Sequence, residues 1–425
     1  MTPAPMAGPD PHAGWRRRLV DLALEHPVRA LLLAYAGSRL VVFVVMWIAA
    51  VWAQNPAGVG HEQPGVSDLF GLWDGTWYGR IARHGYPVPV PADPSTGWLT
   101  YSAWAFYPLF PMLVRGPMML GLPFVASGAV LSLVLGALGV VLVWQVFRSG
   151  PDTVSQSDRE RLALAAAVLW CFHPATGVLM QPYTEALAVV LLTLVLLAMQ
   201  RRWYVWAALG TLVLGLTRAV APALLAVVLV QVLIDIRADR VAGRPVLAGR
   251  RLSTGVLALT TAVSAVLWPL YVGWRTGIPT AFLQIQAAWG QRPTDGLFRA
   301  WLRWSWDAHG LLGLITVILL VVAYVALVAG RHGAWLSTEV RVFAMAYPIY
   351  LMAVVRPITS MWRFALIDVP LAALVASVAL RTANGARIVT HWPRRVVVAL
   401  IVLSVGILWW TCALWVYTPW GSSVP

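Results

Sequence analysis

Long apolar runs separated by short polar connections make up most of the chain. A helix that crosses a membrane needs about 20 consecutive apolar residues. The runs predict eleven such helices, at about 30–53, 123–147, 161–180, 183–200, 203–217, 219–236, 252–274, 310–330, 337–355, 364–381 and 396–417. We therefore expect an all-α polytopic membrane protein. A single transmembrane domain would cover 30–417, between a tail at 1–29 and a tail at 418–425.

The arginines indicate how these helices are oriented. They recur in alternate connections, at 148–161, 201–202, 237–251, 331–341 and 381–395, and also near the N-terminus. Positively charged connections face the cytoplasm. The N-terminus is then cytoplasmic, and the outer face of the plasma membrane carries two long loops, 54–121 and 275–309. Residues 106–148 must then cross the membrane an odd number of times. We therefore expect that 123–147 crosses and that 106–120 is an interfacial or re-entrant helix. If it crosses, the count becomes twelve.

Composition supports the membrane assignment. Hydrophobic residues make up 60% of the chain and charged residues 11%, with a mean hydropathy of +0.73, whereas soluble domains carry about 25% charged residues. The net charge of +14 comes from arginine alone. These arginines lie at the ends of apolar runs, not in one patch, so we expect no nucleic-acid partner. The two cysteines are far apart and predict neither a disulfide framework nor a zinc site. The sequence leaves any need for a divalent metal undecided.

One polar stretch, residues 73–87, follows the first apolar run. Trp73, Trp77, Arg80 and His84 recur at helical spacing, and an aromatic and basic stripe is typical of a helix in a lipid interface. Asp74 lies near the start of this predicted helix, where the helix dipole favours a carboxylate. The stretch alone indicates either an interfacial anchor with a capping Asp or a functional acid.

Ionisable residues at membrane depth are costly, so each is a candidate functional residue. On the predicted topology they gather at the outer face with Asp74, and they are His173, Glu185, Arg218, Arg356, Arg363 and Asp368. Structural alternatives stay open for several. Arg356 could be a snorkelling anchor, Asp368 could form a helix–helix hydrogen bond, and Glu185 could pair with an arginine. His84 and His173 could be packing residues.

One acid beside several arginines suits the transfer of a sugar from a lipid phosphate. Arginine forks match phosphate oxygens and stabilise the charge of the leaving group. A carboxylate removes the proton from the attacking hydroxyl, and one base opposite the leaving group gives inversion. The sequence has no nucleotide-binding glycine loop, and a lipid-linked donor needs none.

Four sequence blocks resemble the PIG-V-type mannosyltransferases of the GT-C superfold, in an actinobacterial version. The blocks are Trp73-Asp74 with Tyr78 and Gly85-Tyr86, Ala105 to Pro111, His173-Pro174-Ala175 with Tyr183 to Leu187, and Thr217-Arg218. A weaker block is Trp362-Arg363-Phe364. The resemblance implies a GT-C-like bundle with interfacial helices in the first outer loop and a polyprenyl-phosphate mannose donor.

The resemblance also implies that Asp74 is the catalytic base. We expect Arg218 and Arg363 at the donor phosphate and Asp68 as a second acid. The other expected pocket residues are Glu185, His173, Tyr78, Arg80 and Tyr107. The linker 87–104 holds Asp93 as its one acid, unlike many eukaryotic members. This difference leaves the acceptor open. Because the resemblance is to a bacterial version of the family, we expect an envelope glycolipid, a glycan or a secreted protein as the acceptor.

Two other classes of function stay open. A lipid-linked glycan transporter or flippase would need polar groups through the middle of the bilayer. The spans here are almost purely apolar at their centres, which favours the transferase. A non-catalytic subunit of an envelope-assembly complex is the third alternative.

Overall fold

The computed structural model describes residues 13–53, 66–243, 249–292, 296–358, 360–382 and 387–412. This part of the chain is helical, and its β structure is limited to two isolated bridges, Ala92–Leu99 and Arg381–Ile388. The described residues include six helices that are long and apolar enough to cross a membrane. They are α2 (Pro27–Ile48), α6 (Phe124–Phe147), α10 (Ala221–Val241), α11 (Gly249–Thr276), α13 (Arg299–Ala329) and α17 (Trp392–Trp410). The prediction of an all-α multi-pass membrane protein is confirmed.

Shorter helices occupy the other predicted spans. They are α7 (Gln156–Cys171), α8 (Glu185–Gln200), α9 (Tyr204–Gly215), α14 (Thr338–Val354), α15 (Met361–Ile367) and α16 (Val369–Leu380). The last two are joined at a bend of 81° and would make a seventh span if counted as one. Every predicted span thus contains a helix, but the count of eleven crossings stays a prediction because several helices are short.

Helix α8 lies inside the bundle, and its N-terminal residue is Glu185, one of the candidate functional residues. Its side chains from Glu185 to Val190 are all buried, and it packs against α6, α9, α14 and α15. A helix that is apolar on every side is expected in the core of a large bundle. Glu185 is therefore held at a fixed position by packing around the whole helix.

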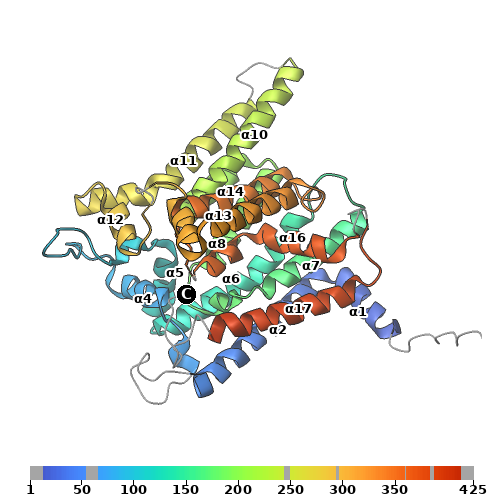
Figure 1. Ribbon diagram of the computed structural model, residues 1–425, viewed down its shortest axis with the longest axis horizontal. Coiled ribbons are helices and arrows are strands. Elements are labelled where there is room, and N and C mark those ends of the chain that lie inside the picture. Colours follow the sequence, from blue (N-terminus) through green and yellow to red (C-terminus); the bar gives the residue numbers. More distant parts are fainter. Residues whose placement is uncertain are drawn as a thin grey trace, which may run out of the picture.

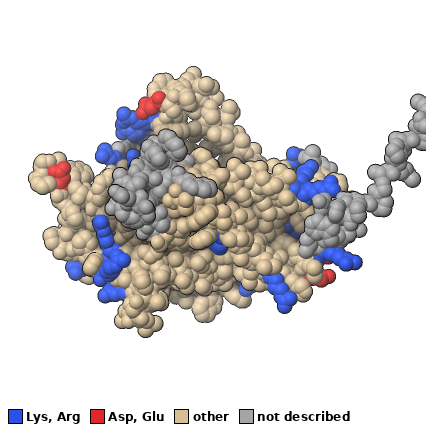
Figure 2. Space-filling model, turned by 90° about the horizontal axis from the view of Figure 1, so that it is seen from below, with Lys and Arg blue, Asp and Glu red and all other residues tan. Residues whose placement is uncertain are grey.

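The helices divide the molecule into two ends. In Figure 1, α4 (Asp74–His84), α5 (Leu109–Met119) and α12 (Ala281–Ala288) lie toward one end of the long axis. Helix α1 (Ala13–Glu25), the start of α7 and the connection from α16 to α17 lie toward the other. Figure 2 shows that most of the visible arginines lie near the two ends, with a broad face of other residues between them. That the arginine-bearing connections share one side of the membrane stays a prediction, as does which side faces the cytoplasm.

The shorter helices add detail to the sequence-based expectations. Helix α1 occupies part of the expected tail 1–29, whose first twelve residues lie outside the described chain, as does the tail 418–425. Helix α5 has 11 residues and is about 16 Å long, so it is too short for a hydrocarbon core of about 30 Å. This agrees with an interfacial or re-entrant helix at 106–120. The remaining short helices are η1 (Ala49–Ala53), η2 (Val66–Leu69), η3 (Ala103–Ala105) and η4 (Thr176–Met180).

Asp368 marks the bend between α15 and α16, which the sequence-based prediction drew as one span. Pro370 stands in the first turn of α16, where proline is tolerated because its missing N–H would have no partner within the helix. Asp368 accepts a hydrogen bond from the Tyr324 hydroxyl at 3.1 Å. This contact between α13 and the bend agrees with the helix–helix alternative for Asp368. The bend turns α15 toward α8 and α4.

A glycine lets the loop before α8 pack closely on α6. A Cβ built on Gly128 would lie 2.4 Å from Pro182 Cβ and 3.0 Å from Pro182 Cα. Contacts this short cannot be relieved by turning a side chain, because the proline ring is fixed to the backbone. Gly128 therefore sets the position of residues 181–184, which lead directly into Glu185.

Gly128→Ala should lower stability by about 1–3 kcal/mol, the usual cost of overpacking a core. Thermal unfolding of the purified protein in detergent would show this as a lower melting temperature. Gly37→Ala in α2 is the matched control, because its added Cβ meets no atom within 4 Å and alanine favours helix. Equal melting temperatures for the two variants would show that the close approach does not constrain the loop.

Candidate active site

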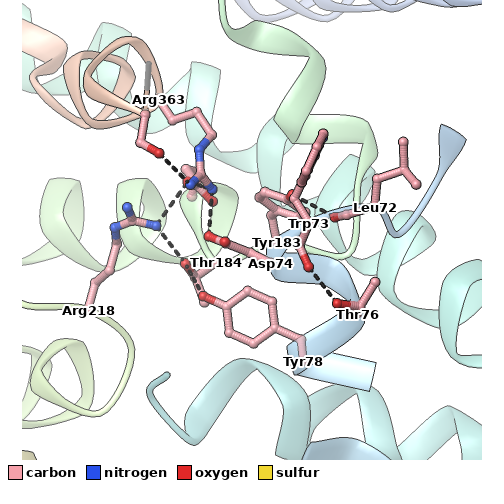
Figure 3. Close-up of polar contacts among 11 residues, drawn as sticks. Leu72, Trp73, Asp74, Thr76, Tyr78, Tyr183, Thr184, Arg218 and Arg363 are labelled. Carbon is pink, nitrogen blue, oxygen red and sulfur yellow. Dashed lines mark hydrogen bonds and ion pairs between the residues drawn. The ribbon is translucent and has the colours of Figure 1, made fainter. Parts of the chain in front are cut away.

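Four charged side chains from four distant parts of the chain meet at the α4 end of the molecule. Asp74 comes from the start of α4, Glu185 from the start of α8, Arg218 from the turn between α9 and α10, and Arg363 from α15. Figure 3 shows Asp74, Arg218 and Arg363 pointing toward one another. We call these four residues the ion-pair cluster.

Arg363 joins the two acids of the cluster. Its Nη1 donates to Asp74 Oδ2 at 2.8 Å and to Glu185 Oε1 at 3.4 Å, and its Nη2 donates to Ser360 Oγ at 3.2 Å. Arg218 Nη1 lies 2.9 Å from the same Glu185 Oε1 and donates to Thr184 Oγ1 at 2.9 Å. Two positive charges are therefore balanced by two negative charges.

Burial makes this balance necessary. The exposed fraction of the side chain is 0% for Glu185, 4% for Arg363 and 15% for Arg218, and it reaches 19% for Asp74. A charge removed from water must be compensated by a partner with good geometry. Asp74 is the most accessible of the four, so it is the acid that a substrate can reach.

Helix α4 holds Asp74 at a fixed point. The residue before it, Trp73, has a backbone φ of 55°, which residues other than glycine rarely adopt. Two hydrogen bonds between side chains of the loop before α8 and the backbone secure this turn. The Tyr183 hydroxyl donates to Leu72 O at 2.8 Å, and Gly71 N donates to Gln181 Oε1 at 2.9 Å. The loop that leads into Glu185 therefore also positions Asp74. The predicted helix with Asp74 at its start is confirmed.

Aromatic rings surround the two arginines. The Arg218 guanidinium carbon lies 4.8 Å from the centre of the Phe364 ring, and that of Arg363 lies 5.2 Å from the Tyr183 ring. Cations over aromatic faces are attracted electrostatically. The Tyr78 hydroxyl and Thr184 Oγ1 share a hydrogen bond of 3.3 Å. Burial, with the Asp74 carboxylate nearby, raises the pKa of Tyr78, so its phenol keeps its proton.

A cavity of about 740 Å³ opens beside the cluster. This volume is within the range of about 300–1,000 Å³ for small-molecule sites. Five residues predicted from the sequence line the cavity: Asp74, Tyr78, Tyr107, Arg218 and Arg363. Glu185 does not line it. Within the described part of the chain, Asp74 is the one carboxylate in the lining.

Besides Glu185, two predicted site residues, His173 and Arg80, lie outside the cavity lining. His173 Nδ1 accepts a hydrogen bond from Ala175 N at 3.2 Å. Its imidazole therefore organises its own turn, as the packing alternative expected. Arg80 is exposed, and its guanidinium carbon lies 4.8 Å from the Trp77 ring. The side chain of Asp68 lies outside what the structure describes.

Several lining residues were not predicted from the sequence. Tyr347 and Tyr350 of α14 line the cavity, as do Gln286, Trp289 and Tyr101. Two tyrosines three residues apart in an apolar run were a usable signal, because that spacing places both hydroxyls on one helix face. Arg356, considered above as a snorkelling anchor, also lines the cavity. Among the described residues, no group of three or more His, Cys, Asp and Glu is arranged to hold a metal.

Glu185→Gln should destabilise the protein by about 3–5 kcal/mol, because it leaves a buried positive charge without its partner. The melting temperature in detergent would measure this loss. Glu160→Gln is the control: Glu160 pairs with Arg148 at 3.1 Å, but the two side chains are 27% and 40% exposed. Removal of such a surface pair should cost less than about 1 kcal/mol. A Glu185 variant as stable as the control would contradict the charge balance.

Comparisons with known proteins give a partial likeness to solved structures alone. No family model matches the chain, and no curated protein matches it. Among solved structures, the chain resembles the oligosaccharyltransferase of Archaeoglobus fulgidus, crystallised with a tethered acceptor peptide that contains the NVT sequon. The TM-score is 0.42 and the identity 17%, over 90% of this chain and 55% of that chain. The chain therefore spans about half the length of that enzyme, and its function has to be argued from the geometry of its own site.

Proposed function

We propose that the protein is a GT-C-type inverting glycosyltransferase. It would move a sugar, mannose on the sequence resemblance, from a polyprenyl-phosphate donor to a hydroxyl of an envelope glycolipid, glycan or protein at the outer membrane face. One observation carries the proposal: within the described chain, Asp74 is the single carboxylate of a cavity that arginines also line. The cavity combines a proton acceptor with groups that bind phosphate.

The proposed step is a displacement at the anomeric carbon of the donor. The acceptor oxygen forms a bond to this carbon while the bond from the carbon to the phosphate oxygen breaks. The electron pair of the broken bond leaves with the phosphate, and the hydroxyl proton passes to Asp74. A positioned carboxylate suits this role because it can accept the proton as the new bond forms. The ion pair with Arg363 at 2.8 Å fixes the direction of the carboxylate.

Arg218 is suited to stabilise the departing phosphate. It lines the cavity, and its Nη1 is held by Glu185 and Thr184. Its Nε and Nη2 make no hydrogen bond within the described chain and can serve as a fork for phosphate oxygens. Donors that are fixed in place before the reaction stabilise developing charge most effectively.

A single accessible carboxylate favours inversion over retention. Retaining enzymes use two carboxyl groups about 5–5.5 Å apart, one of which becomes the nucleophile. Glu185 is the second acid of the cluster, but it is fully buried, is bonded to two arginines and does not line the cavity. It therefore supports the arginines and leaves Asp74 as the one base.

Asp74→Asn should reduce sugar transfer by about 10²–10⁴-fold, the contribution of a general base. The assay uses protein in sealed proteoliposomes with radiolabelled polyprenyl-phosphate mannose and extracted envelope lipids. Asp93→Asn is the control, because Asp93 lies in the same loop outside the cavity lining and accepts a hydrogen bond from Ser95. Undiminished transfer by the Asp74 variant would show that Asp74 is not the base. Passage of the intact lipid-linked sugar across the bilayer would instead favour the alternative that the protein is a lipid-linked glycan transporter.

Arg218→Gln should reduce donor kcat/KM by about a hundredfold, because it removes a preorganised donor from the leaving phosphate. The KM for the acceptor should stay unchanged. Steady-state kinetics with donor and acceptor varied in turn would separate the two. Arg80→Gln is the matched control, since Arg80 is exposed and does not line the cavity. A loss confined to acceptor affinity would contradict the phosphate role of Arg218.

A further inference from the structure

We propose that a second hollow, next to the cavity, is a binding site for the phosphate of a membrane lipid. This arginine hollow has a volume of about 460 Å³, and its charged lining residues in the described chain are Arg292, Arg299, Arg303, Arg356 and Asp307. It goes beyond the proposed function, because it concerns a different set of residues and a lipid that need not be consumed.

The charge of the hollow is not balanced as that of the ion-pair cluster is. Arg299 has a further partner, so the balance rests on Arg292, Arg303 and Arg356, which line the hollow with one acid, Asp307, in the described chain. The acid, Asp307, lies 3.5 Å from Arg303, and the two side chains are 62% and 75% exposed. An exposed pair of this kind contributes little. The hollow therefore keeps a positive excess that an anion would offset.

Its depth in the molecule matches that of lipid head groups. Arg299 and Arg303 belong to the first part of α13, which bends at His309 and Gly310. Beyond the bend α13 is strongly apolar, and only 11% of its most apolar window is buried within the protein. Such a face contacts lipid chains, so the segment before the bend lies at the interface. Exposed Trp304 and Trp306 on that segment agree with this position.

The hollow adjoins the cavity at Arg356. Arg356 and Ile358 line both spaces. Arg356 is fixed in place, because its backbone N donates to Gln291 Oε1 at 2.8 Å and its guanidinium packs on Gly290. A Cβ on Gly290 would lie 2.6 Å from Arg356 Cζ. Its guanidinium forms no ion pair within the described chain, so it is available for a ligand.

A lipid phosphate is the ligand that these features favour. Planar guanidinium groups bind phosphate oxygens in pairs, and the lipid-facing surface of α13 would accommodate the attached chain. Two lipids share this chemistry, an anionic phospholipid and a polyprenyl phosphate. The second would leave its head group at the entrance to the cavity that Asp74 lines.

The test counts lipids retained by the whole purified protein with native mass spectrometry. The probes are two matched pairs, phosphatidylglycerol with diacylglycerol and farnesyl phosphate with farnesol. Wild-type protein should retain at least one phosphate-bearing lipid and should release its uncharged counterpart. The double variant Arg303→Gln/Arg356→Gln should bind it about tenfold more weakly for each arginine lost, given the worth of a hydrogen bond to a charged group.

The control is Arg80→Gln/Arg115→Gln, which removes two exposed arginines from α4 and α5 that line neither space. Arg303→Lys/Arg356→Lys should recover part of the binding, and equal melting temperatures would show that each variant folds. A defect confined to farnesyl phosphate would identify polyprenyl phosphate as the ligand, and a defect that includes phosphatidylglycerol would identify phospholipid head groups.

Two results would overturn the proposal: unchanged affinity and stoichiometry in the Arg303/Arg356 double variant, or an equal loss in the control. The outcome is separate from that of sugar transfer. A protein that transfers no sugar but keeps hollow-dependent lipid binding would refute the proposed reaction alone.

Discussion

The contact between Arg363 and Asp74 is the interaction on which the site depends. It joins residues 289 positions apart in the sequence, and it closes a chain of charges that runs through Glu185 to Arg218. None of these groups could be buried alone, because an isolated charge in a low-dielectric interior costs far more than a paired one. Four separate helices and turns must therefore reach one point together, and the fold is constrained to bring them there.

The surrounding helices have features that serve this convergence. Helix α8 places Glu185 at its buried N-terminus, and the bend at Asp368 directs α15 inward. The close approach of Gly128 to Pro182 sets the position of the loop that precedes α8. The same loop reaches the start of α4 through the Tyr183 hydroxyl. Asp74 is thus held from both sides, and its direction follows from this packing.

The sequence predicts those parts of this arrangement that are local or that follow from topology. The spacing of Trp73, Trp77, Arg80 and His84 predicts α4, because a helix repeats every 3.6 residues. Arginines in alternate connections predict that Asp74, Glu185, Arg218 and Arg363 share one end. The sequence does not predict the details that depend on non-local contacts. Nothing in the spacing shows that His173 turns away, that the chain bends at Asp368, or that Arg356 separates two spaces, since these depend on which side chains meet across the bundle.

The charge balance of the ion-pair cluster has a consequence for the proposed reaction. Before the reaction, two arginines and two carboxylates sum to zero, so the cluster has no excess charge to hold phosphate too tightly. When Asp74 takes the acceptor proton, one negative charge disappears and Arg363 keeps Glu185, which it shares with Arg218, as an ionic partner. The cluster then carries a net charge of +1 at the moment the phosphate gains its negative charge. Stabilisation that arises only as the reaction proceeds accelerates it, whereas binding both states equally would not. The buried pair would thus couple proton transfer to departure of the phosphate.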